Sequence, residues 1–259
     1  MEFKLEGKTA LVTGASKGIG LAVVQALAAE GVQVAACART TSDALAEATP
    51  LTRRADLSDA GQTAEVVAWA LGELGGIDLL VNNVGGSPAR TDGFLAISDE
   101  EWQQAFELNF FSAVRTTRAA LPSLLERKGN IVNIGSVNSQ LALPRLIDYS
   151  AAKAAMTNFA KSLAEEYGGA GLRVNTISPG PTRTAVWTAA DGMASGLSRS
   201  AGIDHEEFVS QVPAMTGLNT GRFTEPEELA VLVVLLASGR VPNMNGADLV
   251  VDGGMLKQL

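Results

Sequence analysis

Three chemically useful side chains are scarce in this sequence: its 259 residues include one cysteine, one histidine and two tyrosines. A single cysteine, Cys37, cannot form a disulfide within the chain, so the fold does not depend on one, and a reducing compartment fits this composition. A single histidine, His205, excludes a histidine-rich metal site, and we expect no metal. The two tyrosines, Tyr149 and Tyr167, leave a tyrosine-based mechanism only two possible positions.

Basic residues and long apolar runs are also in short supply. The chain has 20 Lys and Arg against 28 Asp and Glu, a net charge of −8, which argues against a basic face for nucleic acid or for an anionic membrane. The most apolar run, Val231–Ala237, is far shorter than the ~18 residues of a membrane span, and the N-terminal residues show no secretory signal. We therefore expect a cytoplasmic protein without nucleic-acid or membrane partners.

What the sequence does contain is an alternation of short apolar runs and longer helical patterns. The short runs are continuous stretches of Val, Ile, Leu and Ala, as in strands buried on both faces of a parallel sheet, and the helices between them supply the crossover connections. The pattern predicts a single α/β domain over residues 1–259, with a doubly wound parallel sheet of about seven strands. Residues 39–56, a short connection, should hold a further strand or helix. The expected strands are Thr9–Gly14, Val32–Ala38, Ile77–Asn83, Asn130–Ser136, Leu172–Ser178 and Ala247–Gly254.

Capping signals mark the start of two predicted helices. Ser98 with Glu101 forms an S-x-x-E capping box, and Thr224 with Glu227 has the same spacing, T-x-x-E. The expected helices are Gly18–Gly31, Ser58–Leu74, Ser98 to about Lys128, Tyr149–Tyr167 and Thr224–Ala237.

A glycine-rich turn, Thr13–Gly20, joins the first expected strand to the first helix. Glycines let the backbone approach a ligand closely, and the backbone N–H groups of a helix N-terminus attract a phosphate. A tight turn without a ligand would explain the glycines alone. The position of the turn in the first βα unit of a parallel sheet favours dinucleotide binding.

The same turn contains a second pattern, G-x-S-x-G from Gly14 to Gly18, which is typical of the nucleophile elbow of α/β hydrolases. The chain order Ser16, an acid, then His205 also suits a catalytic triad. Only thirteen residues precede Gly14, however, and they leave no upstream strand and loop to supply the second oxyanion-hole donor. The hydrolase is therefore the weaker alternative, and we expect His205 at the surface.

Tyr149 and Lys153 stand four residues apart, which places a phenol and an ammonium group side by side on one helix face. Alone, such a pair is most often exposed and without function. Tyr167, the other tyrosine, has no lysine four residues later. What distinguishes Tyr149 is Ser136, thirteen residues upstream at the end of an expected strand.

Seven motifs in this order resemble the short-chain dehydrogenase/reductase family over nearly the whole chain. Each motif alone is weak, but seven at plausible distances are specific. The resemblance implies a Rossmann-type fold and hydride transfer between a nicotinamide cofactor and a ketone or secondary alcohol. In appearance the chain is closest to the 3-oxoacyl-carrier-protein reductases and related carbonyl reductases. The motifs are the glycine turn, Asn82–Gly85, Asn109, Ser136, the Tyr149 and Lys153 pair, Pro179–Gly180 and Asp252–Gly254.

The chemistry of ketone reduction suits these residue types. A free tyrosine has a pKa of about 10 and gives its proton slowly, and a neighbouring cation such as Lys153 should lower the pKa of Tyr149 toward the working pH. Ser136 can donate a hydrogen bond to the carbonyl oxygen as charge develops there. The resemblance further implies that Lys153 holds the nicotinamide ribose and that Asn109 carries a water in a proton relay. Asn109 could also be a buried amide that hydrogen-bonds to the helix backbone, a second role that is compatible with the first.

The expected cofactor is NADP(H) rather than NAD(H). NAD enzymes usually carry an acid at the end of the second strand to grip the ribose 2′-OH, whereas this chain has Ala38 followed by Arg39. Lys17 adds a second cation in the glycine turn, although two solvated cations are the simpler alternative. Val84 replaces the alanine common in the family, and the short connection over residues 39–56 puts the adenine-side wall in doubt. The contacts that the resemblance implies, besides Lys17, Arg39, Tyr149 and Lys153, are Gly14, Ser16, Gly18, Ile19, Gly20, Asp56, Leu57, Asn83, Val84, Gly85, Ile134, Pro179, Gly180, Thr182 and Thr184.

We expect the long stretch over residues 184–224 to be a mobile lid over the substrate, with Trp187 in contact with that substrate. Its apolar residues could equally pack in the core or in a subunit interface. An apolar lid suggests a moderately hydrophobic carbonyl substrate, while Arg145, Arg183 or Arg199 could receive a carboxylate or phosphopantetheine. The family also implies a homotetramer or homodimer. Two alternatives stay open: an NAD-dependent alcohol, sugar or steroid dehydrogenase of the same family, and a dinucleotide-binding sensor without catalysis.

Overall fold

The structure is a computed structural model that describes residues 3–86, 88–190 and 192–257 and contains a seven-stranded, wholly parallel sheet. The strand order β3-β2-β1-β4-β5-β6-β7 reverses its direction of winding between β1 and β4, which confirms the predicted doubly wound α/β fold. Residue 191 of the expected lid and both ends of the expected domain lie outside the described residues. The strands are β1 (Thr9–Thr13), β2 (Gln33–Ala38), β3 (Thr52–Arg54), β4 (Leu79–Asn82), β5 (Asn130–Ile134), β6 (Arg173–Pro179) and β7 (Asp248–Val251).

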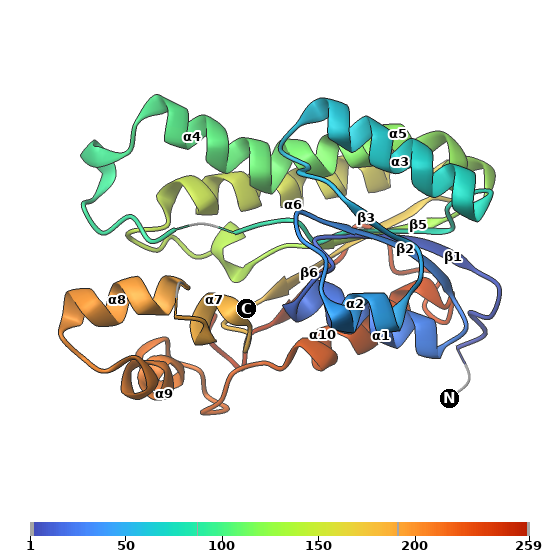
Figure 1. The fold of residues 1–259 in the computed structure, drawn as a ribbon. Helices are drawn as coiled ribbons and strands as arrows, with labels where there is room; N and C mark the ends of the chain where they lie inside the picture. Colours follow the sequence, from blue (N-terminus) through green and yellow to red (C-terminus); the bar gives the residue numbers. More distant parts are fainter. Residues whose placement is uncertain (1–2, 87, 191, 258–259) are drawn as a thin grey trace.

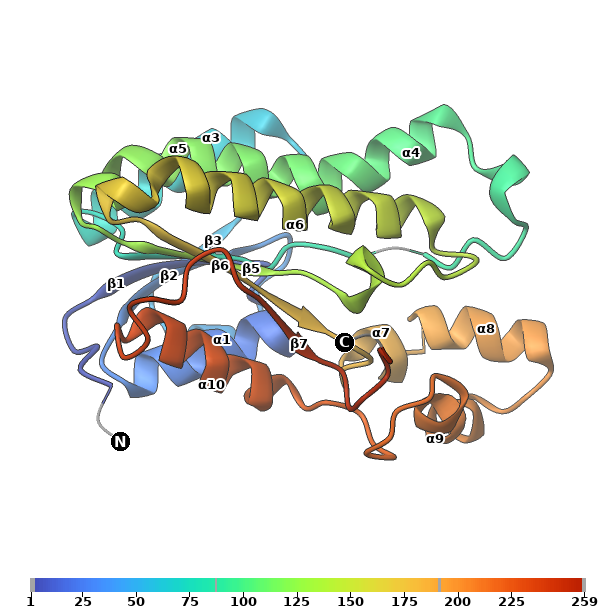
Figure 2. The same cartoon turned by 180° about the vertical axis from the view of Figure 1, so that it is seen from behind.

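Helices cover both faces of the sheet, and three short helices gather beyond the end of β6 (Figures 1 and 2). In the described part of the chain, no helix combines the length and the apolar character needed to cross a membrane. One face carries α1 (Gly18–Ala29), α2 (Asp43–Ala48) and α10 (Pro226–Ala237), the other carries α3 (Ala60–Leu74), α4 (Asp99–Phe106), α5 (Ser112–Glu126) and α6 (Ile147–Tyr167), and the separate group is α7 (Ala185–Thr188), α8 (Met193–Ala201) and α9 (His205–Met215).

The apolar side chains of the strands divide between these two faces. Val12 and Val81 point toward the cluster formed with α1 and α10, whereas Leu11 and Leu80 point toward the cluster formed with α3, α5 and α6. All four are fully buried, as the alternation of side chains along a strand requires when both faces are covered. The carboxyl ends of the strands therefore stay free to form a site at the reversal between β1 and β4.

The short connection over residues 39–56 holds both a helix and a strand. The hydroxyl of Ser42 accepts a hydrogen bond from the backbone of Leu45 and caps α2, and β3 then pairs with β2, with Arg54 opposite Ala38. Leu57 follows β3 and is buried in a small cluster with Cys37. The connection that the sequence left in doubt therefore contains both a helix and a paired strand.

One of the two predicted capping boxes forms. The hydroxyl of Ser98 accepts from the backbone of Glu101, whose carboxylate accepts in turn from the backbone of Ser98. The box predicted at Thr224 is wrong: α10 starts at Pro226 without a side-chain cap, and Thr224 is instead buried in a bridge to Thr182. Pro226 at the first helical position sets the start of α10, because its fixed φ suits that position.

A buried carboxylate, Asp78, ties together the amino ends of β1 and β4. It accepts hydrogen bonds from the backbone and hydroxyl of Thr9 and ion pairs with Arg127 and Lys8. Burial alone would raise the pKa of Asp78, but the bonds from Arg127 and Thr9 and the charge of Lys8 lower it to about 2. The carboxylate therefore contributes stability mainly as an anion.

We expect Asp78→Asn to lower the free energy of unfolding by about 2 kcal/mol near neutral pH, since a shift of one pKa unit corresponds to about 1.4 kcal/mol. Because the folded-state pKa is depressed, this contribution is complete above the unfolded pKa near 3.8 and is lost as pH falls toward about 2. Urea unfolding of both proteins at neutral pH and at successively lower pH measures the difference. A difference that stays constant through that window would contradict the assignment.

Candidate active site

The glycine turn forms a tight cradle at the carboxyl end of β1. Gly14 has φ +64°, a conformation that favours glycine, and a Cβ on Gly20 would clash with the carbonyl oxygen of Gly14 and lie 2.5 Å from Nδ2 of Asn83. Asn83 donates from that nitrogen to the carbonyls of Thr13 and Gly14 at 3.0 and 2.9 Å. The cradle opens at the N-terminus of α1, where Lys17 stands at the N-cap without a side-chain cap bond. This backbone fits a dinucleotide phosphate.

Segments from several crossovers border the cradle. A Cβ on Gly18 would lie 3.0 Å from the methyl of Thr184, so the start of the expected lid lies directly against the turn. Val84 packs on the cluster that contains Leu57, where it extends the adenine-side wall. The remaining predicted contacts lie at strand ends or in the adjoining loops: Ser16 and Ile19 in the turn, Asp56 after β3, Ile134 at the end of β5, and Pro179, Gly180 and Thr182 at and after the end of β6.

Two predicted cations lie near the end of β2. Lys17 and Arg39 are both exposed, and the glycine turn reaches β2 through a hydrogen bond from the backbone of Ala15 to Cys37. Hydrogen bonding to Ser58 is the main cause that lowers the pKa of Asp56, with a smaller effect from the charge of Arg39. Arg39 is therefore close enough to the adenine-side residues to act on them electrostatically.

Ser136, Tyr149 and Lys153 come together between the end of β5 and the first turns of α6. The side chain of Ser136 lies close enough to the Tyr149 phenol to lower its pKa. The ammonium of Lys153 lies over the Tyr149 ring, 5.8 Å from its centroid, and donates to the carbonyl of Ile134 at 2.9 Å. The predicted trio thus forms one constellation, and its lysine is 3% exposed.

The electrostatics of this trio differ from the sequence-based expectation. Burial raises the pKa of Tyr149, and the side chain of Ser136 opposes that effect only in part. Burial also lowers the pKa of Lys153 to about 8. The expected fall in the pKa of Tyr149 is therefore wrong for this structure: the net shift is upward, burial is its largest cause, and Lys153 is not among the causes.

Asn109 lies in a π-helical turn, Glu107–Phe111, that joins α4 to α5. Its Oδ1 accepts from the backbone of Gly86, and its Nδ2 donates to the carbonyls of Gly86 and Ala105, all at 2.9 Å. A Cβ on Gly85 would lie 3.0 Å from both Asn109 Oδ1 and Lys153 Nζ, so Asn109 and the lysine lie next to the same glycine. The buried-amide role predicted for Asn109 is confirmed, and π-turns of this kind are frequent at functional sites.

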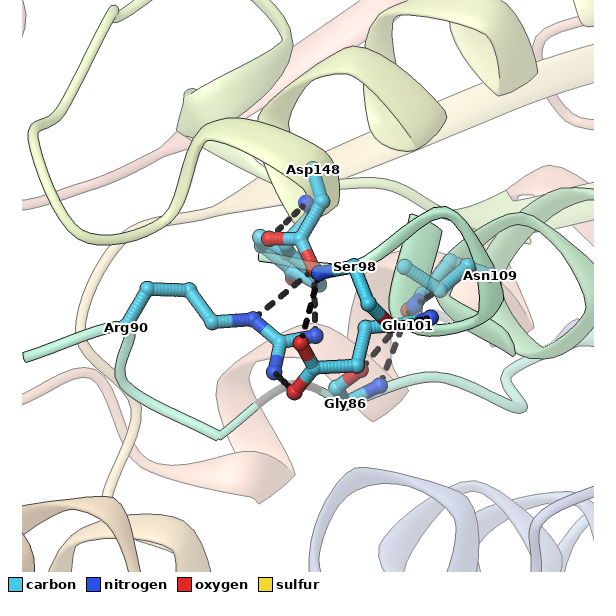
Figure 3. A network of polar contacts seen from close by, with 8 residues as sticks. Gly86, Arg90, Ser98, Glu101, Asn109 and Asp148 are labelled. Carbon is cyan, nitrogen blue, oxygen red and sulfur yellow. Dashed lines mark hydrogen bonds and ion pairs between the residues drawn. The ribbon is translucent and has the colours of Figure 1, made fainter. Parts of the chain in front are cut away.

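Three residues at this site were missed from the sequence. Asn138 accepts from the hydroxyl of Ser136 and donates to Ser150, both at 3.3 Å. Asp148 immediately precedes Tyr149, is 0% exposed and pairs with Arg90 (Figure 3). An acid directly before the tyrosine was the one available signal, whereas nothing local pointed to Arg90.

The stretch over residues 184–224 packs partly on itself. Trp187 packs against Phe223 with the rings tilted and their centroids 5.9 Å apart, and Phe208 is buried in the same cluster. Nε2 of His205 lies 3.4 Å from the carbonyl oxygen of Thr188, within this stretch. Among the described residues, no group of three or more His, Cys, Asp or Glu side chains is placed to hold a metal ion.

The comparison with known proteins agrees with this geometry. Residues 8–194 match the family model described as short chain dehydrogenase. The chain belongs to the short-chain dehydrogenase family. As a member, it is an oxidoreductase that interconverts ketones and secondary alcohols with a nicotinamide cofactor, and the hydrolase alternative for Ser16 is thereby removed.

Relatives of this short-chain dehydrogenase span its full length. It is 35% identical to a 3-oxoacyl-[acyl-carrier-protein] reductase of Vibrio cholerae, over 97% of this chain and 98% of the relative. It is 36% identical to a D-threitol dehydrogenase of Mycolicibacterium smegmatis, over 98% and 94% of the two chains. Among solved structures, L-sorbose reductase from Gluconobacter frateurii, complexed with NADPH and L-sorbose, is 34% identical and covers 100% of both chains with a TM-score of 0.90.

Proposed function

We propose that this enzyme reduces a ketone with NADPH and that Tyr149 is its general acid. The observation that carries the proposal is the constellation of Ser136, Tyr149 and Lys153 beside the glycine cradle, with the lysine ammonium over the tyrosine ring and the serine near enough to act on the pKa of the phenol. Three relatives with related activities, an NADPH-bound sugar reductase among them, support it.

Each residue of the site has a separate task in this proposal. The nicotinamide, when bound, supplies the hydride to the carbonyl carbon. Tyr149 gives its proton to the carbonyl oxygen, and Ser136 hydrogen-bonds to the same oxygen as negative charge develops. Lys153 would hold the nicotinamide ribose. Asn109, beside the lysine at Gly85, would hold a water that returns a proton to the site.

The raised pKa of Tyr149 keeps its phenol protonated at neutral pH, although it also makes the phenol a weaker acid. A phenol whose pKa is raised by burial keeps its proton, which is the form that a general acid requires. Oxidation of the alcohol needs the phenolate, so we expect it to be favoured by higher pH.

Preference for NADPH would come from Lys17 and Arg39. Both cations are exposed beside the cradle, and β2 ends in Ala38 rather than in an acid. A guanidinium can bind a 2′-phosphate through paired, charge-assisted hydrogen bonds. Because Ala38 has no carboxylate, the end of β2 offers no acceptor for the ribose 2′-OH of NAD.

The substrate would enter under the helices of residues 184–224. Trp187 and Phe208 pack within this stretch, so the proposed lid keeps its own small core. We propose a moderately hydrophobic ketone, with a sugar or polyol as the second candidate because two of the relatives are named for such substrates.

A panel of ketones with NADPH tests the proposal. We expect turnover, read as loss of NADPH absorbance, of at least one among ethyl 3-oxobutanoate, a 3-oxoacyl thioester, cyclohexanone and L-sorbose. Faster turnover of the ester and the thioester than of L-sorbose would favour a hydrophobic substrate. The reverse order would favour a sugar. Tight NADPH binding without turnover of any ketone would instead favour a cofactor sensor.

We also propose a cytoplasmic homotetramer or homodimer. Among the large apolar side chains, Phe111 in the turn before α5, Val231 on α10 and Val250 on β7 remain 39–58% exposed. Light scattering of the purified protein measures its mass, and a monomer would contradict the proposal.

A further inference from the structure

A buried ion pair involves Asp148, the residue immediately before the proposed general acid in the sequence, and Figure 3 shows this carboxylate facing Arg90. Nε and Nη2 of Arg90 donate to Oδ2 of Asp148 at 3.0 and 2.6 Å, and the carboxylate is 0% exposed. Oδ1 of Asp148 accepts from the backbone N–H of Tyr149 at 2.9 Å. One carboxylate therefore links Arg90 to the first turn of α6, at the residue proposed to transfer the proton.

Arg90 uses its remaining nitrogen and its backbone for further links. Nη1 donates to Glu101 of α4 at 2.6 Å, and Glu101 caps that helix through Ser98. The backbone N–H of Arg90 donates to the carbonyl of Arg145 at 2.8 Å. Arg145 has φ +69°, an uncommon conformation for a residue other than glycine. Arg90 thus supports the bent backbone that leads into α6.

The segment that carries Arg90 also borders the cofactor side of the site. It begins at Gly85 and Gly86, and Asn109 holds both polar backbone atoms of Gly86. Arg90 anchors the far end of the same segment to Asp148. The two anchors come from the π-turn and from α6, so Gly86 and Arg90 are each fixed to an element that carries a residue of the site.

We propose that Arg90, acting through Asp148, is a positioning residue that holds Tyr149 and the first turn of α6 in the arrangement needed for proton transfer. This inference rests on the proposed function of Tyr149. We assign Arg90 no part in the chemistry itself, since each of its three guanidinium nitrogens already donates to Asp148 or Glu101.

The expected effect follows from the geometry of the pair. Without Arg90, the buried carboxylate of Asp148 has lost its cation, a strongly unfavourable arrangement, and the first turn of α6 shifts to relieve it. A displacement of about 1 Å at a reacting group can cost about 100-fold in rate. We therefore expect Arg90→Met to lower kcat about 10–100-fold, while the Kd for NADPH, measured by fluorescence, stays within about 2-fold.

The pH profile of kcat distinguishes positioning from mere stability. Among the described residues, the charged and titratable groups at the start of α6 are Arg90 and Arg145 on the connecting segments, Glu101 on α4, and Asp148, Tyr149 and Lys153 on α6 itself. Arg90→Met leaves the Asp148 anion, which opposes formation of the Tyr149 phenolate. The pH above which kcat for reduction falls, its alkaline limit, should therefore rise by about half a pH unit or more. Asp148→Asn leaves a cation that favours the phenolate, so the limit should fall. The double variant should return toward the limit of the wild type.

Arg127→Met is the matched control. It removes an arginine that pairs with another buried carboxylate, Asp78, at the opposite ends of the strands. We expect it to lower Tm without changing kcat or the pH profile. Asp148→Asn is nearly isosteric, so it keeps the comparison informative if Arg90→Met folds poorly.

The measurements use NADPH and the ketone of the panel with the highest turnover. A fall in kcat no larger than that of Arg127→Met, or pH limits of Arg90→Met and Asp148→Asn that move in the same direction, would overturn the inference. An inactive Tyr149→Phe beside a normal Arg90→Met refutes the positioning role alone. An active Tyr149→Phe refutes the proposed function on which that role depends.

Discussion

Replacing Tyr149 with phenylalanine should lower kcat for ketone reduction by about 10²–10⁴-fold, the range that general acid–base catalysis contributes. The substitution removes one oxygen and leaves the ring that faces Lys153 in place. The proton donor is lost, whereas the glycine cradle and the lysine are not. The Kd for NADPH should therefore change by no more than about 2-fold, because uniform binding is retained. Steady-state kinetics and fluorescence titration measure the two quantities.

The second tyrosine provides the control. Tyr167 lies at the end of the same helix, packs against the core and has no lysine or serine partner of the catalytic kind. Tyr167→Phe should leave kcat unchanged. Near-normal turnover in Tyr149→Phe would falsify the mechanism, whatever the result for Tyr167.

Arg39→Ala should weaken the preference for NADPH over NADH by about 10–150-fold, because a charge-assisted hydrogen bond contributes about 1.5–3 kcal/mol. Arg39 is exposed immediately after β2, beside the N-terminus of α1. The alanine variant loses a cation that only the 2′-phosphate of NADPH can use. The ratio of kcat/KM for the two cofactors, with one ketone, gives the preference directly.

Arg53 offers a matched control on the neighbouring strand β3. Its guanidinium lies 5.9 Å from the Trp69 ring centroid and 3.7 Å from a carboxylate oxygen of Glu65. Arg53→Ala removes the same charge from the same edge of the sheet, and we expect the cofactor ratio to stay within about 2-fold. A wild-type enzyme that prefers NADH, or an Arg39→Ala variant with an unchanged ratio, contradicts the assignment.

The fold could be predicted from the sequence because its signals are local. Runs such as Thr9–Thr13 are apolar on both sides of the strand and alternate with helical patterns, and a parallel sheet is the arrangement that buries them. The catalytic candidates were recognisable because their order resembles a known family. Tyr149 and Lys153 are one helical turn apart and Ser136 follows β5 by two residues, and it was the resemblance to short-chain dehydrogenases that marked all three as catalytic.

The sequence-based predictions were wrong where contacts with segments distant in the sequence decide the environment of a residue. Thr224 has the spacing of a capping residue, yet it is held in a bridge to Thr182, and Pro226 begins the helix. The pKa of Tyr149 was expected to fall because Lys153 is near in sequence. Its rise comes from burial by the surrounding fold, and the spacing of two residues carries no information about how much water reaches them.

By itself, the sequence determined which residue types meet at the carboxyl ends of the strands, since that follows from periodicity and short spacings. Only the tertiary structure decided what holds them in place. Arg90 and Asp148 are 58 residues apart, and no local pattern relates them. They meet because β4 and β5 are adjacent in the sheet, which brings the segment after β4 beside the helix that follows β5. A buried carboxylate requires a partner, and the fold alone selects which cation can reach it.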